Sequence, residues 1–322
     1  MTRYIFLSFL VCLSVTLAAQ TERGSIHIKN ATVITVTNGV FENADVVIEN
    51  GKITGVGTSL RTPSGAKVVD ATGKFVMPGI IDAHSHIALE SVNEATNPVT
   101  AEVSTEDVID PLDVGIYRAL AGGVTATHAM HGSANAIGGQ CETIKLRYGT
   151  YNPAEMKMQG APRTIKFALG ENPMRVHGEG NGILPRTRMG VEQVFRQAFS
   201  EARDYMNAQD AYEKAKATDV GATPPEYNHR MEVLADILRG EIIIHCHSYR
   251  ADEILMLMNV CKDFGITRLV YQHVNEGFKV APELAEFGAM ASVFADWWAY
   301  KFEVYYSTAY NAAILTKNGV VT

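Results

Sequence analysis

PGIIDAHSH, at residues 78–86, predicts a short apolar strand that ends in two histidines, His84 and His86. In an extended strand, side chains two positions apart point to the same side. Two imidazoles at one strand end can hold a cation, because zinc and similar metals favour neutral imidazole nitrogen. A His-x-His pair is weak evidence by itself, so the rest of the chain decides how it is interpreted.

Downstream of this stretch, segments typical of strands and of helices alternate, which implies a parallel sheet. The strands are apolar throughout, as expected when both faces are covered. An open Rossmann-like sheet would carry a glycine-rich phosphate loop after its first strand, where this chain has histidines. We therefore predict a (β/α)8 TIM-type barrel, whose polar residues gather at the carboxyl ends of the strands. Strands are expected at 79–84, 124–130, 163–169, 241–247, 268–274 and 290–294, and helices at 110–121, 191–217, 226–239, 251–264, 282–287 and 311–317.

The segment before the barrel predicts a small β-sandwich. Short alternating or β-branched runs occupy residues 25–37, 44–49, 52–57, 67–70 and 74–77, and Asn50-Gly51 is a strong hairpin signal between two of them. The expected organisation is a signal peptide at 1–19, a partial β-sandwich domain at 20–76 and a hydrolase barrel at 77–322.

The first residues indicate export. Arg3 precedes an uncharged apolar run at 4–17, and the small residues Ala18 and Ala19 suit cleavage by signal peptidase. The run is shorter than the roughly 20 residues of a comfortable membrane span, although an N-terminal anchor is the alternative. We expect a periplasmic or secreted protein with no stable membrane span after cleavage.

Composition narrows the function class. A net charge of −7 argues against a nucleic-acid-binding protein, and 47% apolar residues are enough for a sizeable core. The cysteines that would remain after cleavage, Cys141, Cys246 and Cys261, are too few and too irregular for a disulfide framework.

Three stretches resemble the amidohydrolase superfamily: residues 78–86, IENGKI at 48–53 and GGVTAT at 122–127. Within it, the chain is most similar to the imidazolonepropionase-like amidohydrolases, from about residue 26 onward. The resemblance implies a barrel with one or two divalent metals, most typically zinc, which activate water against a C–N bond. That bond would belong to an amide, a cyclic amide or a small peptide.

The resemblance also implies which residues bind the metal. A free lysine is a cation, so Lys166 would act as a carboxylated lysine that bridges two metals. Glu171 is the alternative carboxylate, and a surface lysine is the structural alternative for Lys166. The expected ligands are His84, His86, Lys166, His245 and His273.

Residues beside these ligands are expected to bind substrate: His247, Tyr249, Arg250 and Glu276. His247 shares its side of the strand with His245, and a buried structural histidine is the alternative. Asp296, Trp297 and Trp298 are expected to line the pocket or the rim of the barrel. Residues 132–135 and 138–140 predict a polar, glycine-rich loop.

The resemblance places a general acid–base aspartate at the end of an eighth strand. The sequence stops at Thr322, where Gly319–Thr322 begin such a strand. We expect this aspartate beyond Thr322, in a longer product of which the sequence is a C-terminally truncated form. An exported prolidase-like dipeptidase and a catalytically inactive barrel that acts as a binding or scaffold protein stay open as alternatives. The expected partner is a small molecule or short peptide, and association into a homo-oligomer is left open.

Overall fold

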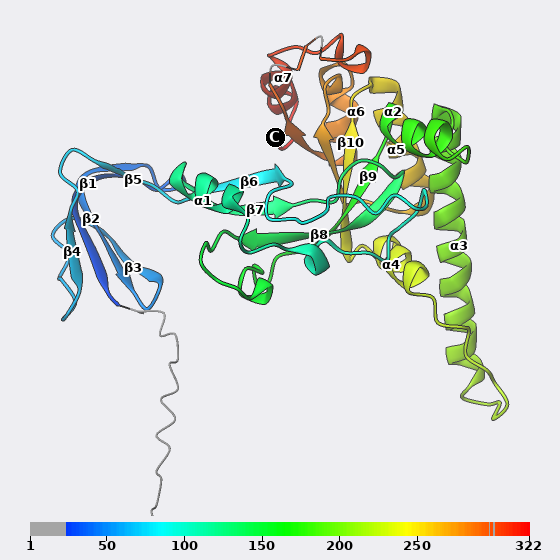
Figure 1. Ribbon diagram of the computed structural model, residues 1–322, viewed down its shortest axis with the longest axis horizontal. Coiled ribbons are helices and arrows are strands. Elements are labelled where there is room, and N and C mark those ends of the chain that lie inside the picture. The colour runs from blue at the N-terminus through cyan, green and yellow to red at the C-terminus, as the bar shows by residue number, and fades with distance from the viewer. Residues whose placement is uncertain (1–23, 296, 299) are drawn as a thin grey trace, which may run out of the picture. The chain divides into compact units, whose positions relative to one another are not determined.

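The computed structural model describes residues 24–295, 297–298 and 300–322 (Figure 1). The chain divides into two compact units between Pro78 and Gly79. The expected signal peptide at 1–19 and Asp296 lie outside the described residues.

The first unit is a five-stranded sheet in the order β3-β2-β1-β4, with β5 also paired to β1. Asn50 and Gly51 both have positive φ, 51° and 76°, and form the predicted hairpin turn between β2 and β3. Alanines and valines of β1 and β2 make its small core. The second sheet of a sandwich stays a prediction. The strands are β1 (Ile26–Ile34), β2 (Val40–Glu49), β3 (Lys52–Gly57), β4 (Lys67–Asp70) and β5 (Phe75–Val76).

The second unit contains a seven-stranded sheet in the order β12-β11-β10-β9-β8-β7-β6. The six predicted strands are confirmed within two residues at either end. Four of the six neighbouring pairs are parallel. The strands are β6 (Ile80–Ser85), β7 (Val124–Ala129), β8 (Ile137–Lys145), β9 (Arg163–Ala168), β10 (Ile242–Ser248), β11 (Leu269–His273) and β12 (Met290–Val293).

The strand β8 corrects two predictions. It contains residues 138–140, which were expected in a loop, and it runs antiparallel to β7 and β9, so the sheet is not all parallel. Packing explains its glycines: a Cβ on Gly138 would lie 2.7 Å from Nδ1 of His131, and one on Gly139 would lie 2.7 Å from Cγ2 of Val103. The glycines therefore permit close approach inside a strand.

Helices cover the outer face of β9–β11. The aromatic core there includes Phe167 of β9, whose ring stacks on those of Phe195 and Phe199 at 5.5 and 6.0 Å. This core supports the strand ends that carry the candidate site. The helices are α1 (Val114–Ala121), α2 (Glu171–Met174), α3 (Arg188–Ala215), α4 (His229–Leu238), α5 (Ala251–Phe264), α6 (Ala281–Phe287) and α7 (Asn311–Lys317), with a short π-helix at Arg175–Gly180.

The sheet curls so that its two ends face each other. His84 of β6 lies at one end, yet its ring is 4.9 Å from that of His273 of β11 and 5.2 Å from that of Phe294, just after β12. Val321 pairs in parallel with Met290 of β12, where a further strand was predicted to begin. The fold is therefore α/β with a barrel-like sheet, and the complete eight-stranded barrel stays a prediction.

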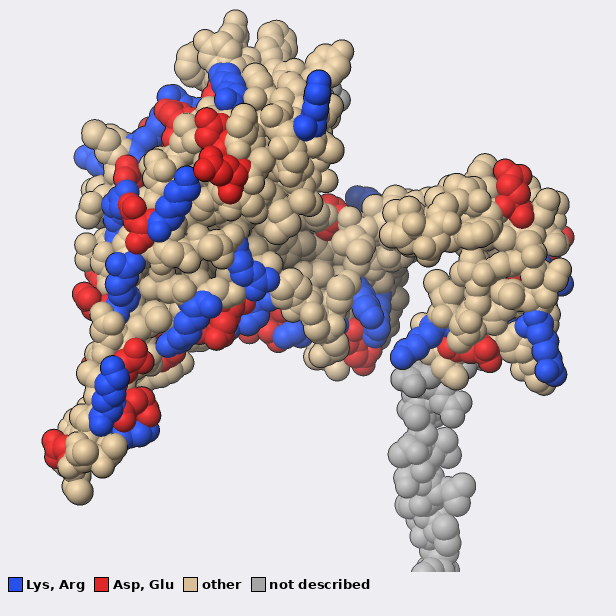
Figure 2. All heavy atoms as spheres, turned by 180° about the vertical axis from the view of Figure 1, so that it is seen from behind, with Lys and Arg blue, Asp and Glu red and all other residues tan. Residues whose placement is uncertain are grey.

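The surface of the described residues carries mixed charge. Lys and Arg lie among Asp and Glu side chains over the face shown in Figure 2. None of the helices in the described ranges has both the length and the apolar character that a membrane crossing requires.

Candidate functional site

The structure brings four histidines from three strands into one group. The ring of His84 lies 5.3 Å from that of His86 and 4.9 Å from that of His273. His273 in turn lies 4.7 Å from His247. The strands β6, β10 and β11 that supply these residues are far apart in sequence. We call His84, His86, His247 and His273 the histidine cluster.

The end of β11 has an unusual backbone. His273 and Val274 have φ values of 65° and 46°, in the left-handed region that non-glycine residues rarely adopt. Such a conformation costs roughly 1–2 kcal/mol per residue and is found preferentially at functional sites. The turn interrupts the alternation of the strand, so that Gln272 and the following His273 both contact His84.

Lys166 lies fully buried beside the cluster, so the alternative of a surface lysine is wrong. Its Nζ donates to Nε2 of His84 at 3.5 Å, and no carboxylate in the described part of the chain pairs with it. Burial lowers the pKa of Lys166 to about 8. A buried ammonium without an anion is costly, whereas conversion to a carbamate would remove the positive charge.

Gln272 orients two histidines and was not singled out from the sequence. Nδ1–H of His84 donates to Oε1 of Gln272 at 2.7 Å, and Nε2–H of Gln272 donates to Nδ1 of His245 at 2.9 Å. The available signal was a polar residue within the apolar strand, directly before His273. In this arrangement Nε2 of His84 is unprotonated and faces Nζ of Lys166, whereas His245 carries its proton on Nε2.

The ring of His86, like that of His84, carries its proton on Nδ1. Its Nδ1–H donates to the carbonyl oxygen of Met130 at 2.7 Å, which leaves the Nε2 lone pair of His86 available. A hydrogen bond from the second ring nitrogen to a carbonyl is the usual support of a metal-binding histidine.

The two histidines of β10 occupy different surroundings. His245 packs against His128 at 4.5 Å, and His128 is hydrogen-bonded to Oγ1 of Thr164 at 2.8 Å. His247 is 2% exposed and contacts His273, and neither of its ring nitrogens has a hydrogen-bond partner among the described residues. The resemblance favours His245 as a ligand, whereas the ring contacts place His247 in the cluster.

Burial keeps these imidazoles neutral. It lowers the pKa of His84 to about 3 and that of His128 to about 4, and the Lys166 ammonium adds to both effects. Burial also holds the pKa values of His245, His247 and His273 well below their usual range. Neutral imidazole is the form that binds a metal.

The donor set fits a divalent cation by its chemistry. Nε2 of His84 and of His86 carries a lone pair, and both nitrogens of His247 lack partners in the described chain. Across the described ranges, however, no three His, Cys, Asp or Glu side chains already converge on one metal position. Binding would require these rings to adjust, and His84 would exchange its Lys166 contact for the metal.

Aromatic side chains pack against the histidine cluster. Tyr249 is 4% exposed and its ring lies 4.5 Å from that of His247. Trp297 stacks on His273 at 4.8 Å. Trp297 therefore contacts the cluster, whereas Trp298 is 65% exposed.

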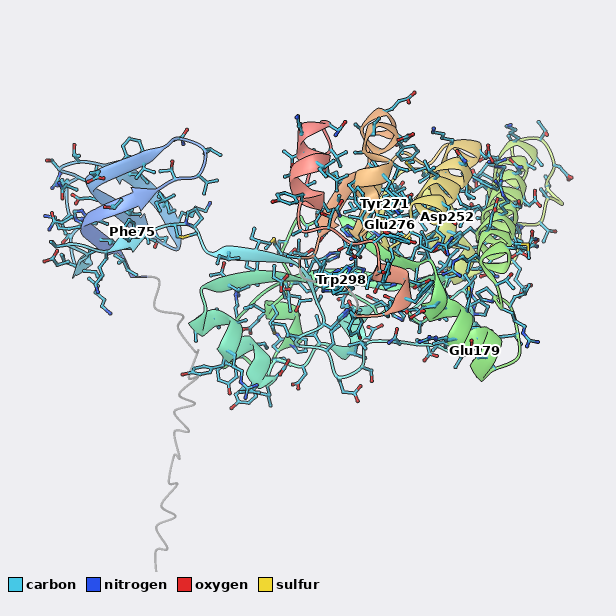
Figure 3. All side chains as sticks on the ribbon, turned by 90° about the horizontal axis from the view of Figure 1, so that it is seen from above. Phe75, Glu179, Asp252, Tyr271, Glu276 and Trp298 are labelled. Carbon is cyan, nitrogen blue, oxygen red and sulfur yellow. The ribbon has the colours of Figure 1, made fainter. Side chains whose placement is uncertain are left out.

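A cavity of about 780 Å³ lies among residues that follow the strands β9, β10 and β11. Its walls include Arg250 and Glu276, two of the expected substrate-binding residues, and also Glu171. Arg250 pairs with Asp252 at 2.7 Å, and Glu276 pairs with Lys279 at 2.7 Å. Glu171 pairs with Lys301 at 3.0 Å instead of joining the histidines, so its role as a ligand is not favoured. We call this space the charged cavity; Glu276 and Asp252 are labelled in Figure 3.

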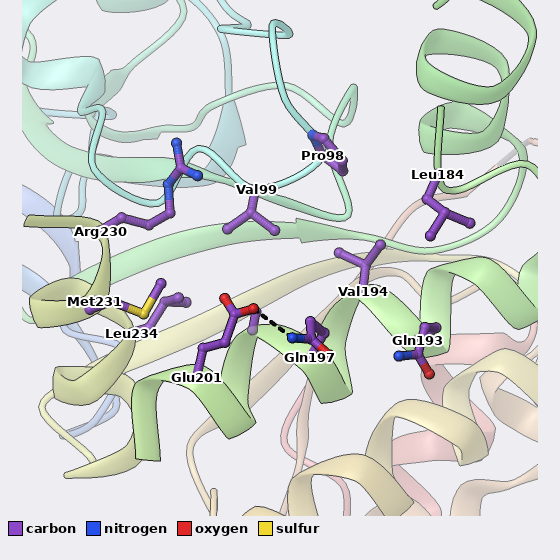
Figure 4. Close-up of a pocket in the computed structure, with 11 residues that line it drawn as sticks. Pro98, Val99, Leu184, Gln193, Val194, Gln197, Glu201, Arg230, Met231 and Leu234 are labelled. Atoms are coloured by element: carbon purple, nitrogen blue, oxygen red, sulfur yellow. Dashed lines mark hydrogen bonds between the residues drawn. The ribbon is translucent and has the colours of Figure 1, made fainter. Parts of the chain in front are cut away.

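A second cavity, of about 390 Å³, lies between α3, α4 and residues 98–99 (Figure 4). Val99, Val194 and Leu234 give it a largely apolar wall. None of the expected site residues lines it, so the chemistry is assigned to the strand ends.

Comparison with known proteins agrees with this architecture. No family model matches the chain. The structure of an amidohydrolase from Thermotoga maritima is 38% identical and superposes with a TM-score of 0.83, covering 92% of this chain and 76% of that one.

Curated relatives carry related names. Amidohydrolase tasK of Hapsidospora irregularis is 30% identical over 305 residues, which cover 86% of this chain. A dihydroorotase of Trichlorobacter lovleyi is 31% identical over 152 residues, or 47% of this chain. Each match covers 31% of the relative, so the chain spans about a third of the length of these proteins. On its likeness to the Thermotoga structure over most of both chains, the chain belongs to the amidohydrolase superfamily.

Proposed function

We propose that this chain forms the metal-binding part of a hydrolase that cleaves a C–N bond in an amide, a cyclic amide or a small peptide. The observation that carries the proposal is the convergence of His84, His86 and His273 beside the buried Lys166. In barrels of this kind, chemistry takes place at the carboxyl ends of the strands, where these residues lie.

The ligands we assign are His84, His86, Lys166, His273 and one histidine of β10. Zinc suits these donors best, because it favours nitrogen ligands. Lys166 would bind as a carbamate: its neutral Nζ forms an N–C bond to carbon dioxide and releases a proton, and the anion formed offers two oxygens. The carbamate also supplies the negative charge that the described surroundings of Lys166 lack.

Gln272 favours His247 over His245 as the β10 ligand. An amide has one accepting side and one donating side. Gln272 therefore frees the Nε2 lone pair of only one of the two histidines that it bridges, and that one is His84. His245 would then orient Gln272, while His247 binds the metal.

A divalent cation at this site supplies Lewis-acid chemistry, which acidifies water and polarises a carbonyl group. The chain's own residues position and enclose the reactants. Gln272 and the Met130 carbonyl hold the rings of His84 and His86 in one tautomer. Tyr249 and Trp297 exclude bulk water from the His247–His273 side. We assign no general base among the described residues.

Metal content tests the proposal. Purified protein loaded with zinc is expected to retain one or two equivalents after dialysis, and a His84→Ala/His86→Ala double variant is expected to lose them. His229→Ala is the matched control, because His229 is exposed on α4 and outside the cluster. Equal metal content in wild type and the double variant would rule out this site.

A further inference from the structure

We propose that the charged cavity binds a cationic group of the substrate, either an ammonium or a guanidinium. This inference rests on the proposed function, because it assigns a substrate class to the same site. The cavity lies where residues following β9, β10 and β11 meet. Tyr249 and Lys301 link its wall to the histidine cluster: the ring of Tyr249 lies 4.5 Å from that of His247, and Nζ of Lys301 lies 4.3 Å from the Tyr249 ring and 3.0 Å from Glu171 of the cavity wall.

Carboxylates form the floor of the charged cavity. The side chains of Glu303, Glu276 and Glu171 are only 4%, 9% and 15% exposed. The cations that line it are more exposed: 33% for Arg188, 38% for Lys279, 40% for Arg250 and 64% for Arg175. A ligand that reaches the floor therefore meets negative charge, while the rim cations are long side chains that can move aside.

The protein's own cations already occupy the positions that a ligand would take. Nζ of Lys279 lies 2.7 Å from Oε1 of Glu276. Glu171 lies within 3.4 Å of the exposed Arg175 and 3.0 Å of Lys301. A ligand ammonium or guanidinium could replace Arg175 at Glu171, because that contact is long and the arginine is mostly in solvent.

Ion pairs lie next to the floor. Three carboxylates, Glu171, Glu253 and Glu303, share three cations, Arg175, Arg188 and Lys301, of which Arg175 is mostly in solvent. Nε of Arg188 lies 3.1 Å from Oε1 of Glu253, and Nζ of Lys301 lies 3.5 Å from Oε2 of Glu303, but neither contact has hydrogen-bond geometry, and Oε2 of Glu253 has no donor among the described residues. Burial, the main cause, and the neighbouring Glu303 raise the pKa of Glu253 to about 7, against the attraction of Arg188. A ligand cation rich in N–H groups would supply donors to the carboxylates of this floor.

Aromatic rings at the mouth add a second means of recognition. Phe302 and Tyr306 line the cavity and are 87% and 63% exposed. Nζ of Lys279 already lies 4.4 Å from the centre of the Tyr306 ring. Aromatic faces attract ammonium and guanidinium groups at such distances, so the mouth and the floor favour the same ligand charge.

The test compares ligands that differ only in charge. Both the zinc-loaded and the metal-free chain are titrated calorimetrically with arginine and with citrulline. Citrulline has a neutral urea group in place of the guanidinium of arginine, with a similar shape. Lysine and norleucine form a second pair, and glutamate reports the opposite charge. We expect arginine and lysine to bind at least about tenfold more tightly than their neutral partners, the effect of one hydrogen bond to a charged group. Their affinity should fall with salt.

Variants locate the binding. Glu171→Gln and Glu276→Gln are expected to weaken arginine binding about tenfold, with a cooperative melting transition above the titration temperature as evidence of folding. Glu192→Gln is the control, because Glu192 is a half-exposed acid on α3 that pairs with Arg196 away from the cavity. Equal affinity for citrulline, tighter binding of glutamate, or unchanged affinity in both variants would overturn the inference.

The outcome is separable from the proposed function, because binding to the metal-free chain requires neither metal nor turnover. Selective arginine binding that depends on Glu171 supports the inference even if the His84/His86 test fails. Retention of zinc without selectivity for cations removes the inference and leaves the hydrolase proposal standing.

Discussion

The histidine cluster and the charged cavity lie at the same strand ends but treat charge in opposite ways. In the cluster, burial among the strands of the sheet keeps the histidines neutral and leaves Lys166 without an anion in the described chain. In the cavity, residues of short helices and of the start of α3 hold carboxylates and cations together in ion pairs. The comparison shows that the available partner decides between the two: a buried ionisable group without a counter-ion is costly, whereas the carboxylates of the cavity are buried beside cations.

The largest effects on zinc binding and stability are expected from replacing two lysines, Lys166 beside the histidine cluster and Lys301 beside the charged cavity. Lys166→Met should abolish most zinc binding, yet raise the unfolding free energy of the metal-free chain by about 1–3 kcal/mol, because it removes an unpaired buried polar group. Lys301→Met should leave zinc binding intact and lower stability by a similar amount, since it leaves Glu171 and Glu303 short of a cation. Denaturant unfolding and metal analysis of both variants measure this. The same change in zinc binding and in stability in both variants would contradict the proposed difference between the two regions.

The next largest effect is a difference in zinc affinity between variants of His247 and of His245. His245→Asn should reduce zinc affinity by at most roughly 10–100-fold, as expected for a residue that acts through Gln272, whereas His247→Asn, which removes a ligand, should reduce it more. Competition with a fluorescent chelator gives both values. A larger loss in His245→Asn would assign the ligand to His245 and show that Gln272 has the opposite amide orientation.

A smaller effect concerns pH and the acid Glu253. Its pKa rises from 4.5 to about 7 on folding, through burial and the nearby Glu303, against the attraction of Arg188. The folded state therefore holds the proton more tightly, so stability should fall as pH rises from about 4.5 to about 7, by about 1–3 kcal/mol in total. Unfolding free energies at pH 5 and pH 7.5 measure the slope. Glu253→Gln should flatten it, and an identical slope in that variant would assign the effect to another group.

The smallest effect is expected at the rim. Arg250 is 40% exposed and pairs with Asp252, which is 60% exposed. Exposed pairs contribute about 0–1 kcal/mol, so Arg250→Ala should hardly change the melting curve. Because it removes a rim cation, it should not weaken arginine binding to the cavity. Weaker binding would indicate that Arg250 holds a ligand carboxylate instead.

Local patterns predicted most of the elements. The helix at Ala251–Phe264 and the strand at Lys52–Gly57 have the predicted bounds, because a single apolar period and clear end signals determine each. The strand β8 was missed, since Gly138 and Gly139 have the composition of a loop while their function is to allow packing against His131 and Val103.

For the candidate site, residue type predicted the members but not their partners. His84, His86 and His273 were chosen from strand ends, and the structure brings them into ring contact. The role of Gln272 and the ion pairs around Glu253 were not predicted, because each depends on residues distant in sequence.

The sequence by itself determined the α/β alternation, the hairpin at Asn50-Gly51 and the chemical identity of the donors, since each of these depends on neighbouring residues. Only the tertiary structure decided which donors meet, that Lys166 is buried, and that the adjacent cavity has an acidic floor. The physical reason is that burial and charge pairing are properties of three-dimensional surroundings: the same lysine or glutamate is neutral, paired or unpaired according to what the curled sheet and its loops place beside it.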